Sequence, residues 1–117
     1  MHKQLDVWQA AMRFVSALYR LTKQFPSDER FGLTNQIQRA SVSIPSNIAE
    51  GSARHGNKEY VQFLYIALGS AAEVETQLLI ARDLGYVDSI DDLYNDVQSI
   101  KRMLLGLIKS KQAKEFK

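Results

Sequence analysis

Polar side chains recur at helical spacing between residues 39 and 54. Glu50 and Arg54 lie four residues apart, so they can form an ion pair on one helix. Three interpretations fit the set: a solvated helix face, a buried polar network between subunits, or a binding site for phosphate or another ligand. The residues of this polar stripe are Arg39, Ser43, Asn47 and Glu50, with Ser46 and Arg54 beside them.

Residues that could catalyse a reaction or hold a metal ion are sparse. A four-helix bundle can bind two metal ions through Glu-x-x-His pairs, but no glutamate here is followed three positions later by histidine. The chain has no cysteine and no glycine-rich phosphate loop. His2 and His55 are expected in a terminus and a loop, as solvated side chains. We therefore expect no enzyme activity, no catalytic residue, no cofactor and no metal.

Charge is distributed unevenly along a chain whose formal net charge is only +2. Residues 83–96 contain five aspartates and no basic residue, whereas residues 101–117 contain six basic residues and one glutamate, a balance of +5. The basic segment is either a solvated helix end or an arm that binds phosphate, because cations are favoured at helix C-termini in any case.

Hydrophobic periodicity predicts four helices joined by short connections, so consecutive helices should be antiparallel neighbours. Asn57 is expected to cap the third helix and Gly85 to end it. Pro45 lies inside the second helix, where its missing N–H should produce a kink. We predict an all-α, antiparallel up-and-down four-helix bundle that forms a single domain over residues 1–117. The helices are predicted over residues 3–24, 31–54, 57–84 and 89–113.

Two apolar stripes run along the first predicted helix. One stripe includes Trp8 and Met12, and the other includes Phe14 and Leu18, so half of the circumference is apolar. A bundle helix usually needs an apolar face only about 100° wide. The surplus fits either a deeper core or a contact between subunits, and exposed apolar patches commonly mark interfaces.

Small residues fill the stretch from Gly69 to Ala72 in the third predicted helix. A glycine inside a helix costs about 1 kcal/mol relative to alanine. Its presence therefore predicts that a neighbouring backbone crosses the helix closely at this point.

Several longer stretches match a known pattern, and they resemble the four-helix-bundle family of intervening-sequence proteins encoded within bacterial large-subunit ribosomal RNA genes. The sequence is also similar to the accessory variability proteins of diversity-generating retroelements. The resemblance extends from about Leu5 to Gly85 and is weaker in the last helix. The matching stretches are Leu5–Ala10, Tyr19–Thr22, Phe31–Ala40, Ser43–Gly51, Lys58–Tyr60, Phe63–Leu64 and Gly69–Ser70.

The resemblance implies a bundle that assembles into a ring-like homopentamer. In the retroelement branch it also implies binding to nucleic acid and to a reverse transcriptase. It supplies no catalytic residue to transfer to this chain.

We expect a non-enzymatic, homo-oligomeric accessory protein that binds the backbone of RNA or DNA through basic surfaces of a ring-like assembly. Five copies would carry five times +2, or +10. The aromatic residues are assigned to the core, so base stacking is not expected. The alternative is a protein-interaction scaffold with no direct nucleic-acid contact. The candidate phosphate contacts are Arg13, Arg20, Lys23, Arg39, Arg54, Lys58, Lys101, Arg102 and Lys109.

The expected location is the cytoplasm. Residues 1–6 lack the layout of a signal peptide, and the absence of cysteine fits a reducing compartment. No uninterrupted apolar run approaches the ~18 residues that suggest a membrane span, so no membrane partner is expected.

Overall fold

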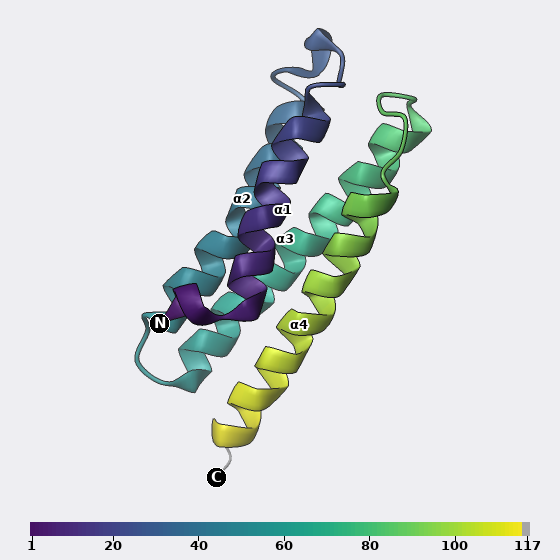
Figure 1. The fold of residues 1–117 in the computed structure, drawn as a ribbon. Coiled ribbons are helices and arrows are strands. Elements are labelled where there is room, and N and C mark those ends of the chain that lie inside the picture. Colours follow the sequence, from purple (N-terminus) through teal and green to yellow (C-terminus); the bar gives the residue numbers. More distant parts are fainter. Residues whose placement is uncertain (116–117) are drawn as a thin grey trace.

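The computed structural model describes residues 1–115, with the side chains of residues 1–113. Four long helices run alternately up and down the length of a bundle that measures 50 × 23 × 20 Å (Figure 1). The predicted all-α, four-helix fold is confirmed, and each long helix begins and ends within about three residues of its predicted bounds. The elements are η1 (His2–Gln4), α1 (Asp6–Thr22), η2 (Ser27–Glu29), α2 (Leu33–Ser52), α3 (Asn57–Asp83) and α4 (Asp91–Glu115).

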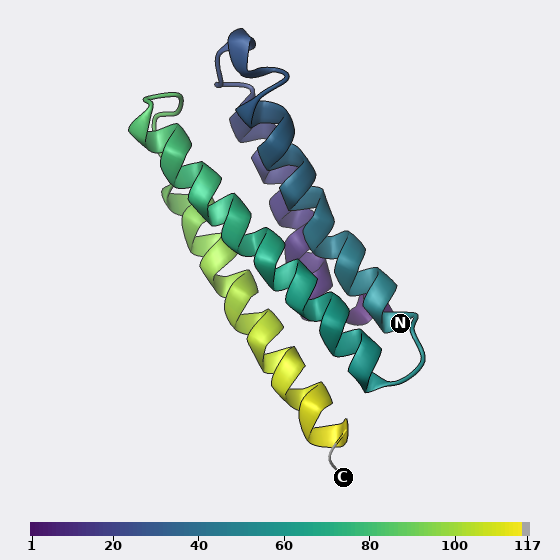
Figure 2. The same cartoon turned by 180° about the vertical axis from the view of Figure 1, so that it is seen from behind.

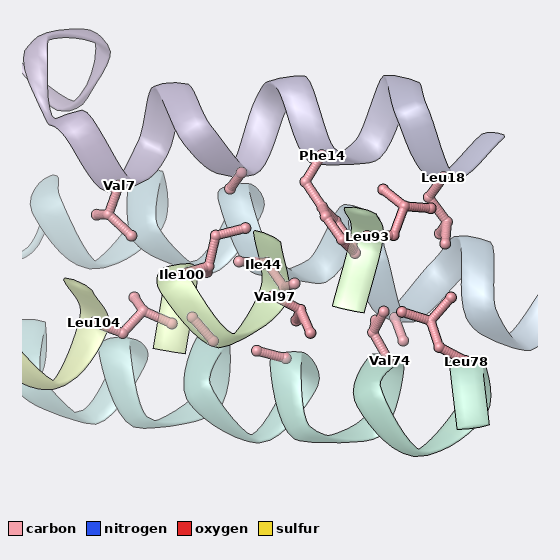
Figure 3. Close-up of a cluster of buried hydrophobic side chains, with 14 of the residues drawn as sticks. Val7, Phe14, Leu18, Ile44, Val74, Leu78, Leu93, Val97, Ile100 and Leu104 are labelled. Atoms are coloured by element: carbon pink, nitrogen blue, oxygen red, sulfur yellow. The ribbon is translucent and has the colours of Figure 1, made fainter. Parts of the chain in front are cut away.

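One apolar core runs along the axis of the bundle and receives side chains from all four long helices (Figure 3). In α1 the buried stripe is the one that contains Phe14 and Leu18. Burying a leucine or phenylalanine side chain contributes roughly 1.5–3 kcal/mol, so these rows of apolar residues dominate the stability of the bundle. The largest fully buried side chains are those of Phe14, Leu18, Ile37, Ile44, Ile48, Leu64, Val74, Leu78, Val97, Ile100, Leu104 and Ile108.

Two glycines bound α3. Gly85 has a φ of +74°, and the amides of Gly85 and Tyr86 donate to the carbonyls of Arg82 and Ala81, which is the predicted glycine stop. Gly56, with a φ of +77°, occupies the N-cap position of α3. The prediction that Asn57 caps α3 is therefore wrong, because Asn57 is the first helical residue and no side chain caps this helix.

Of the two helical glycines Gly51 and Gly69, only Gly51 of α2 lies close to a neighbouring helix. A Cβ atom at Gly51 would lie 2.7 Å from the Cβ of Phe63 on α3, whereas a Cβ at Gly69 would have no atom within 4 Å. The predicted tight crossing at Gly69 is thus wrong within one chain. α2 continues as a helix through Pro45, and a kink there stays a prediction.

By length and composition, α3 is the one described helix that could cross a membrane, with a third of its most apolar window buried in the bundle. Uninterrupted apolar runs do not reveal it, since Gln62, Ser70 and Glu73 break the pattern. A helix that has neighbours on two sides in a bundle can also be apolar enough to meet this criterion. α3 is such a helix, since it packs against both α2 and α4. The absence of a membrane partner stays a prediction.

The two loops at one end of the bundle are joined by Glu29. Its carboxylate accepts hydrogen bonds from the hydroxyl of Tyr86 at 2.6 Å and from the backbone amide of Leu33 at 3.0 Å. The ring of Tyr86 also lies 5.8 Å from that of Phe25. The hydrogen bond from Tyr86, and then that from Leu33, lowers the pKa of Glu29, and the same contact raises the pKa of Tyr86. Glu29 therefore connects the α1–α2 and α3–α4 loops.

Replacing Tyr86 by Phe should weaken this connection in a pH-dependent way. The pKa of Glu29 is depressed in the folded chain, so its contribution is present above the unfolded pKa, about 4.3, and is lost as pH falls through the folded pKa. We expect Tyr86→Phe to lower the Tm at neutral pH, and the difference in Tm between the wild-type chain and the variant should become smaller at acidic pH. Thermal unfolding across pH measures this, with Tyr19→Phe as a control because Tyr19 is exposed and no hydrogen bond of its hydroxyl is found among the described residues. A Tm difference that is constant with pH would contradict the role of Glu29.

Replacing the two glycines by alanine should separate their roles. Gly51→Ala forces a Cβ into Phe63 and should cost about 1–3 kcal/mol of unfolding free energy. Gly69→Ala adds a Cβ in open space and should be neutral or stabilise by up to about 1 kcal/mol. Urea unfolding at matched protein concentration measures both, and equal effects would show that α2 and α3 are not closely packed at Gly51.

Candidate functional site

The polar stripe lies along the outer seam between α2 and α3. The hydroxyls of Ser43 and Ser70 are 2.8 Å apart, and the side-chain amide of Asn47 donates to both the hydroxyl and the carbonyl of Ser43, each at 2.8 Å. Ser43, Asn47 and Ser70 are half-buried. This part of the stripe is therefore a hydrogen-bond network that joins two helices of the same chain.

The charged members of the stripe are exposed. Arg54 forms the expected ion pair with Glu50 at 2.8 Å, and its guanidinium also lies 4.8 Å from the centre of the Phe63 ring. Arg39 lies at a shallow recess of about 390 Å³ that is also lined by Ser70 and Glu73. Because Glu73 faces the same recess, a phosphate at Arg39 would also meet a carboxylate.

Lys101 differs from the other candidate phosphate contacts because it holds two helices together. Its ammonium donates to the carboxylate of Glu75 on α3 at 2.5 Å, and the hydroxyl of Tyr94 lies 3.5 Å from the other carboxylate oxygen. The hydrogen bond from Lys101 is the main cause that lowers the pKa of Glu75. Lys101 is therefore committed to the α3–α4 seam, whereas the adjacent Arg102 is exposed.

Arg13 and Arg20 lie on α1 beside a groove between α1 and α4. Its lining includes Asp96 of α4, and a second hollow shares Arg20 and Asp96 and adds Asp92. Carboxylates across the groove lower the local potential that a phosphate would meet. These two arginines are thus poorer phosphate contacts than their sequence suggests.

One end of the bundle collects three of the remaining candidates, Arg54, Lys58 and Lys109. The up-and-down topology brings the α2–α3 loop, the N-terminal segment and the last turns of α4 together (Figure 1). The ammonium of Lys111 lies 5.3 Å from the centre of the Tyr60 ring, so the end of α4 packs beside the start of α3. Lys3 and Lys111 are not among the nine residues predicted as phosphate contacts, although Lys111 belongs to the basic segment of residues 101–117. The cations of this basic end are Lys3, Arg54, Lys58, Lys109 and Lys111.

The two ends of the bundle carry opposite net charge. Among residues 1–113, whose side chains the structure describes, the five cations of the basic end exceed the three carboxylates there, Asp6, Glu50 and Glu59, by two. At the other end three cations, Lys23 among them, face six carboxylates, a balance of minus three. The nine sequence candidates therefore do not form one surface, and Arg54, Lys58 and Lys109 are the three that come together. The other cations at that acidic end are Arg30 and Arg82, and its carboxylates are Asp28, Glu29, Asp83, Asp88, Asp91 and Asp92.

The prediction that the aromatic residues lie in the core is wrong for Phe31, Tyr19 and Tyr65. Phe31 is 85% exposed, with the guanidinium of Arg30 at 5.2 Å from its ring, and the two tyrosines are also exposed. None of the three lies in the turns that form the basic end. Base stacking beside the basic end is therefore still not indicated.

An apolar groove lies between α1 and α2, on the outside of the bundle. It encloses about 310 Å³, and Met12 and Val42 on its walls are 45% and 40% exposed. Trp8, Met12 and Val15 of the second apolar stripe of α1 thus line this groove, and Leu5 and Trp8 also pack against the edge of the core. The residues of the apolar groove are His2, Trp8, Met12, Val15, Val42, Pro45, Ser46 and Ala49.

Comparison with known proteins identifies the family. The family model for the 23S rRNA-intervening sequence protein matches residues 3–106. The chain belongs to the 23S rRNA-intervening sequence protein family. No curated protein matches the chain. The similarity to retroelement accessory variability proteins, with a reverse transcriptase as partner, stays a prediction.

A solved structure has the same fold as this intervening-sequence family member. It is a protein of unknown function from the S23 ribosomal protein family of Bacteroides thetaiotaomicron, with a TM-score of 0.82 and 26% sequence identity. The alignment covers 93% of this chain and 99% of that one. The four-helix architecture therefore extends over essentially the whole of both chains.

Lys101 and Arg102 offer a matched pair for testing which cations are structural in this family member. Lys101→Gln removes a charged hydrogen bond from a largely buried carboxylate and should lower the unfolding free energy by about 1–2 kcal/mol. Arg102→Gln removes the same charge from an exposed position and should change it by less than about 0.5 kcal/mol. Chemical unfolding of both variants measures the difference, and equal stabilities would show that the Glu75 contact is dispensable.

Proposed function

We propose that this protein is a non-enzymatic, homo-oligomeric accessory protein that binds the phosphate backbone of RNA or DNA through its basic end. The observation that carries the proposal is the separation of charge along the bundle, which collects Arg54, Lys58, Lys109 and Lys111 at one tip. Phosphate contacts supply most sequence-independent affinity for nucleic acids, and lysine and arginine side chains make them.

Self-assembly is supported by the apolar groove. Trp8, Met12 and Val42 line a hollow on the outside of the bundle, where water meets apolar side chains. Covering such a surface with another protein surface is favourable, since each Å² of apolar area removed from water contributes roughly 25 cal/mol. Assembly would also bring several basic ends into one particle, so that weak contacts from each subunit add up.

The family name supports an association with RNA only indirectly, because it describes where the genes of such proteins lie. The acidic end argues for a defined orientation: a polyanion should approach the tip that carries Lys58 and Lys109 and be repelled from the tip that carries Asp88 and Asp91. The binding is expected to read backbone charge and not base sequence.

A salt titration with structured RNA and duplex DNA tests this function. Reversing three cations of the basic end, with Lys58→Glu, Lys109→Glu and Lys111→Glu, should weaken binding at least about tenfold at low salt and reduce the slope of log K against log salt by about two to three. The slope falls because a protein with fewer cations neutralises fewer phosphates and therefore releases fewer counterions from the nucleic acid.

The control carries the same change in net charge at other positions: Arg13→Glu, Arg20→Glu and Lys23→Glu. It should weaken binding much less, and circular dichroism should show that both triple variants keep their helices. Equal losses in the two variants would place binding elsewhere, and no binding of the wild-type chain to either nucleic acid at low salt would remove the proposal.

A further inference from the structure

A groove of mixed charge lies between α1 and α4, the first and last of the long helices. It consists of two hollows of about 380 and 490 Å³ that share Ala17, Arg20 and Asp96, so they form one continuous groove. Phe14 and Ile100 of the core form part of its floor. Seen from behind, α3 lies in front of α1, between α2 and α4 (Figure 2). The mixed-charge groove therefore opens on the opposite side of the bundle, the side seen in Figure 1.

The two walls of this groove have the spacing of a surface that packs against a helix. On each wall the lining residues recur at intervals of three and four, which places them in one row along their helix. The α1 row is Ala10, Arg13, Ala17, Arg20 and Gln24, and the α4 row is Ser89, Asp92, Asp96, Ser99 and Met103. Each row covers fourteen helical steps, about 21 Å, so a third helix of about four turns can lie along both rows.

The two walls carry opposite charge. Arg13 and Arg20 lie seven residues apart on α1, and Asp92 and Asp96 lie four apart on α4, all with exposed side chains. In the part of the chain whose side chains are described, none of the four forms an ion pair. Where one helix packs beside another, charges on the flanks of its apolar seam determine which partner it accepts. These four charges are thus placed where a docked helix would meet them.

We propose that the mixed-charge groove binds an amphipathic α-helix of another protein, with acidic side chains on the flank beside α1 and basic side chains on the flank beside α4. Ala10, Ala17 and Ser99 are small, so the apolar seam of such a helix can approach the floor closely. A helix turned end to end exchanges its two flanks, so the wall charges also determine its direction. This interaction uses neither the apolar groove nor the basic end, and it does not depend on the proposed function.

Charge favours a protein helix over a nucleic acid in this groove. A nucleic acid presents phosphates of one sign along its whole length, so Asp92 and Asp96 would repel it wherever Arg13 and Arg20 attract it. A helix can present both signs at once, one on each side of its apolar seam. The partner that fits is therefore a helix whose two polar flanks differ in sign.

Three synthetic peptides test the proposal. Each has three heptads with leucine at the a positions and alanine at the d positions, and each is stapled on its outer face so that it is helical alone. The mixed peptide carries glutamate at every e position and lysine at every g position, whereas the other two carry only glutamate or only lysine at both. Fluorescence anisotropy at low salt should show that the wild-type chain binds the mixed peptide at least about tenfold more tightly than either of the others. Salt should reduce this preference, because it screens the wall charges.

Two double variants of the protein should change the preference in opposite directions. Arg13→Glu with Arg20→Glu makes both walls acidic, so this variant should bind the lysine peptide most tightly. Asp92→Lys with Asp96→Lys makes both walls basic, so this variant should bind the glutamate peptide most tightly. The matched control is Arg30→Glu with Arg82→Glu, which makes the same change in net charge as the first variant at exposed positions outside the groove. It should keep the wild-type preference, and circular dichroism should show that all three variants keep their helices.

Equal binding of the three peptides to the wild-type chain would overturn the proposal, and so would variants that keep the wild-type preference. A failure of all three peptides to bind would also overturn it, including a failure that arises because a second copy already fills the groove.

The position of the bound peptide can be measured in this cysteine-free chain. A mixed peptide with a chloroacetyl group on its apolar seam should alkylate Ser99→Cys, which places a thiol in the groove. It should not alkylate Thr76→Cys, which places the same thiol at an exposed position on α3. Equal labelling of the two variants, or labelling of Thr76→Cys alone, would show that the peptide binds elsewhere and overturn the proposal.

Discussion

The close approach of α2 to α3 at Gly51 determines how the rest of the surface is arranged. Because Gly51 lacks a side chain, Phe63 can lie against the α2 backbone, and this brings Ser43 and Ser70 within hydrogen-bond distance further along the seam. With that seam closed, Pro45 and Val42 face α1 and line the groove. One close contact thus separates two surfaces. The polar side chains of the α2–α3 seam find hydrogen-bond partners within the chain, whereas the apolar groove stays open to water.

Features that depend on a single helix could be predicted from the sequence. The periodicity of apolar residues gives the helices and the core, and four-residue spacing gives the pair between Glu50 and Arg54. Contacts between helices could not be predicted in this way. Lys101 looks like any solvated lysine until Glu75, 26 residues away, lies beside it. Periodicity also cannot say which face of a helix meets a neighbour, so it predicted the crossing at Gly69 and gave no sign of the one at Gly51.

The separation of charge was visible in the sequence, but its consequence depends on topology. Asp91 and Asp92 begin α4, and Lys109 and Lys111 lie in its last two turns. At 1.5 Å per residue, the 20 residues from Asp91 to Lys111 span about 30 Å. The antiparallel path of α2 and α3 then places Arg54 and Lys58 beside the lysines. The uneven distribution of charge along the sequence thereby gives the two ends of the folded bundle opposite charge.

The positions of these surfaces are mutually compatible. The apolar groove lies along the side of the bundle between α1 and α2, whereas the basic cations lie at its tip. Side-to-side contacts therefore leave the tip uncovered. In the proposed assembly, bundles that pack side by side with parallel long axes would have all their basic tips on one side. The small excess of positive charge on each subunit then adds across one rim, where a polyanion can contact several subunits at once.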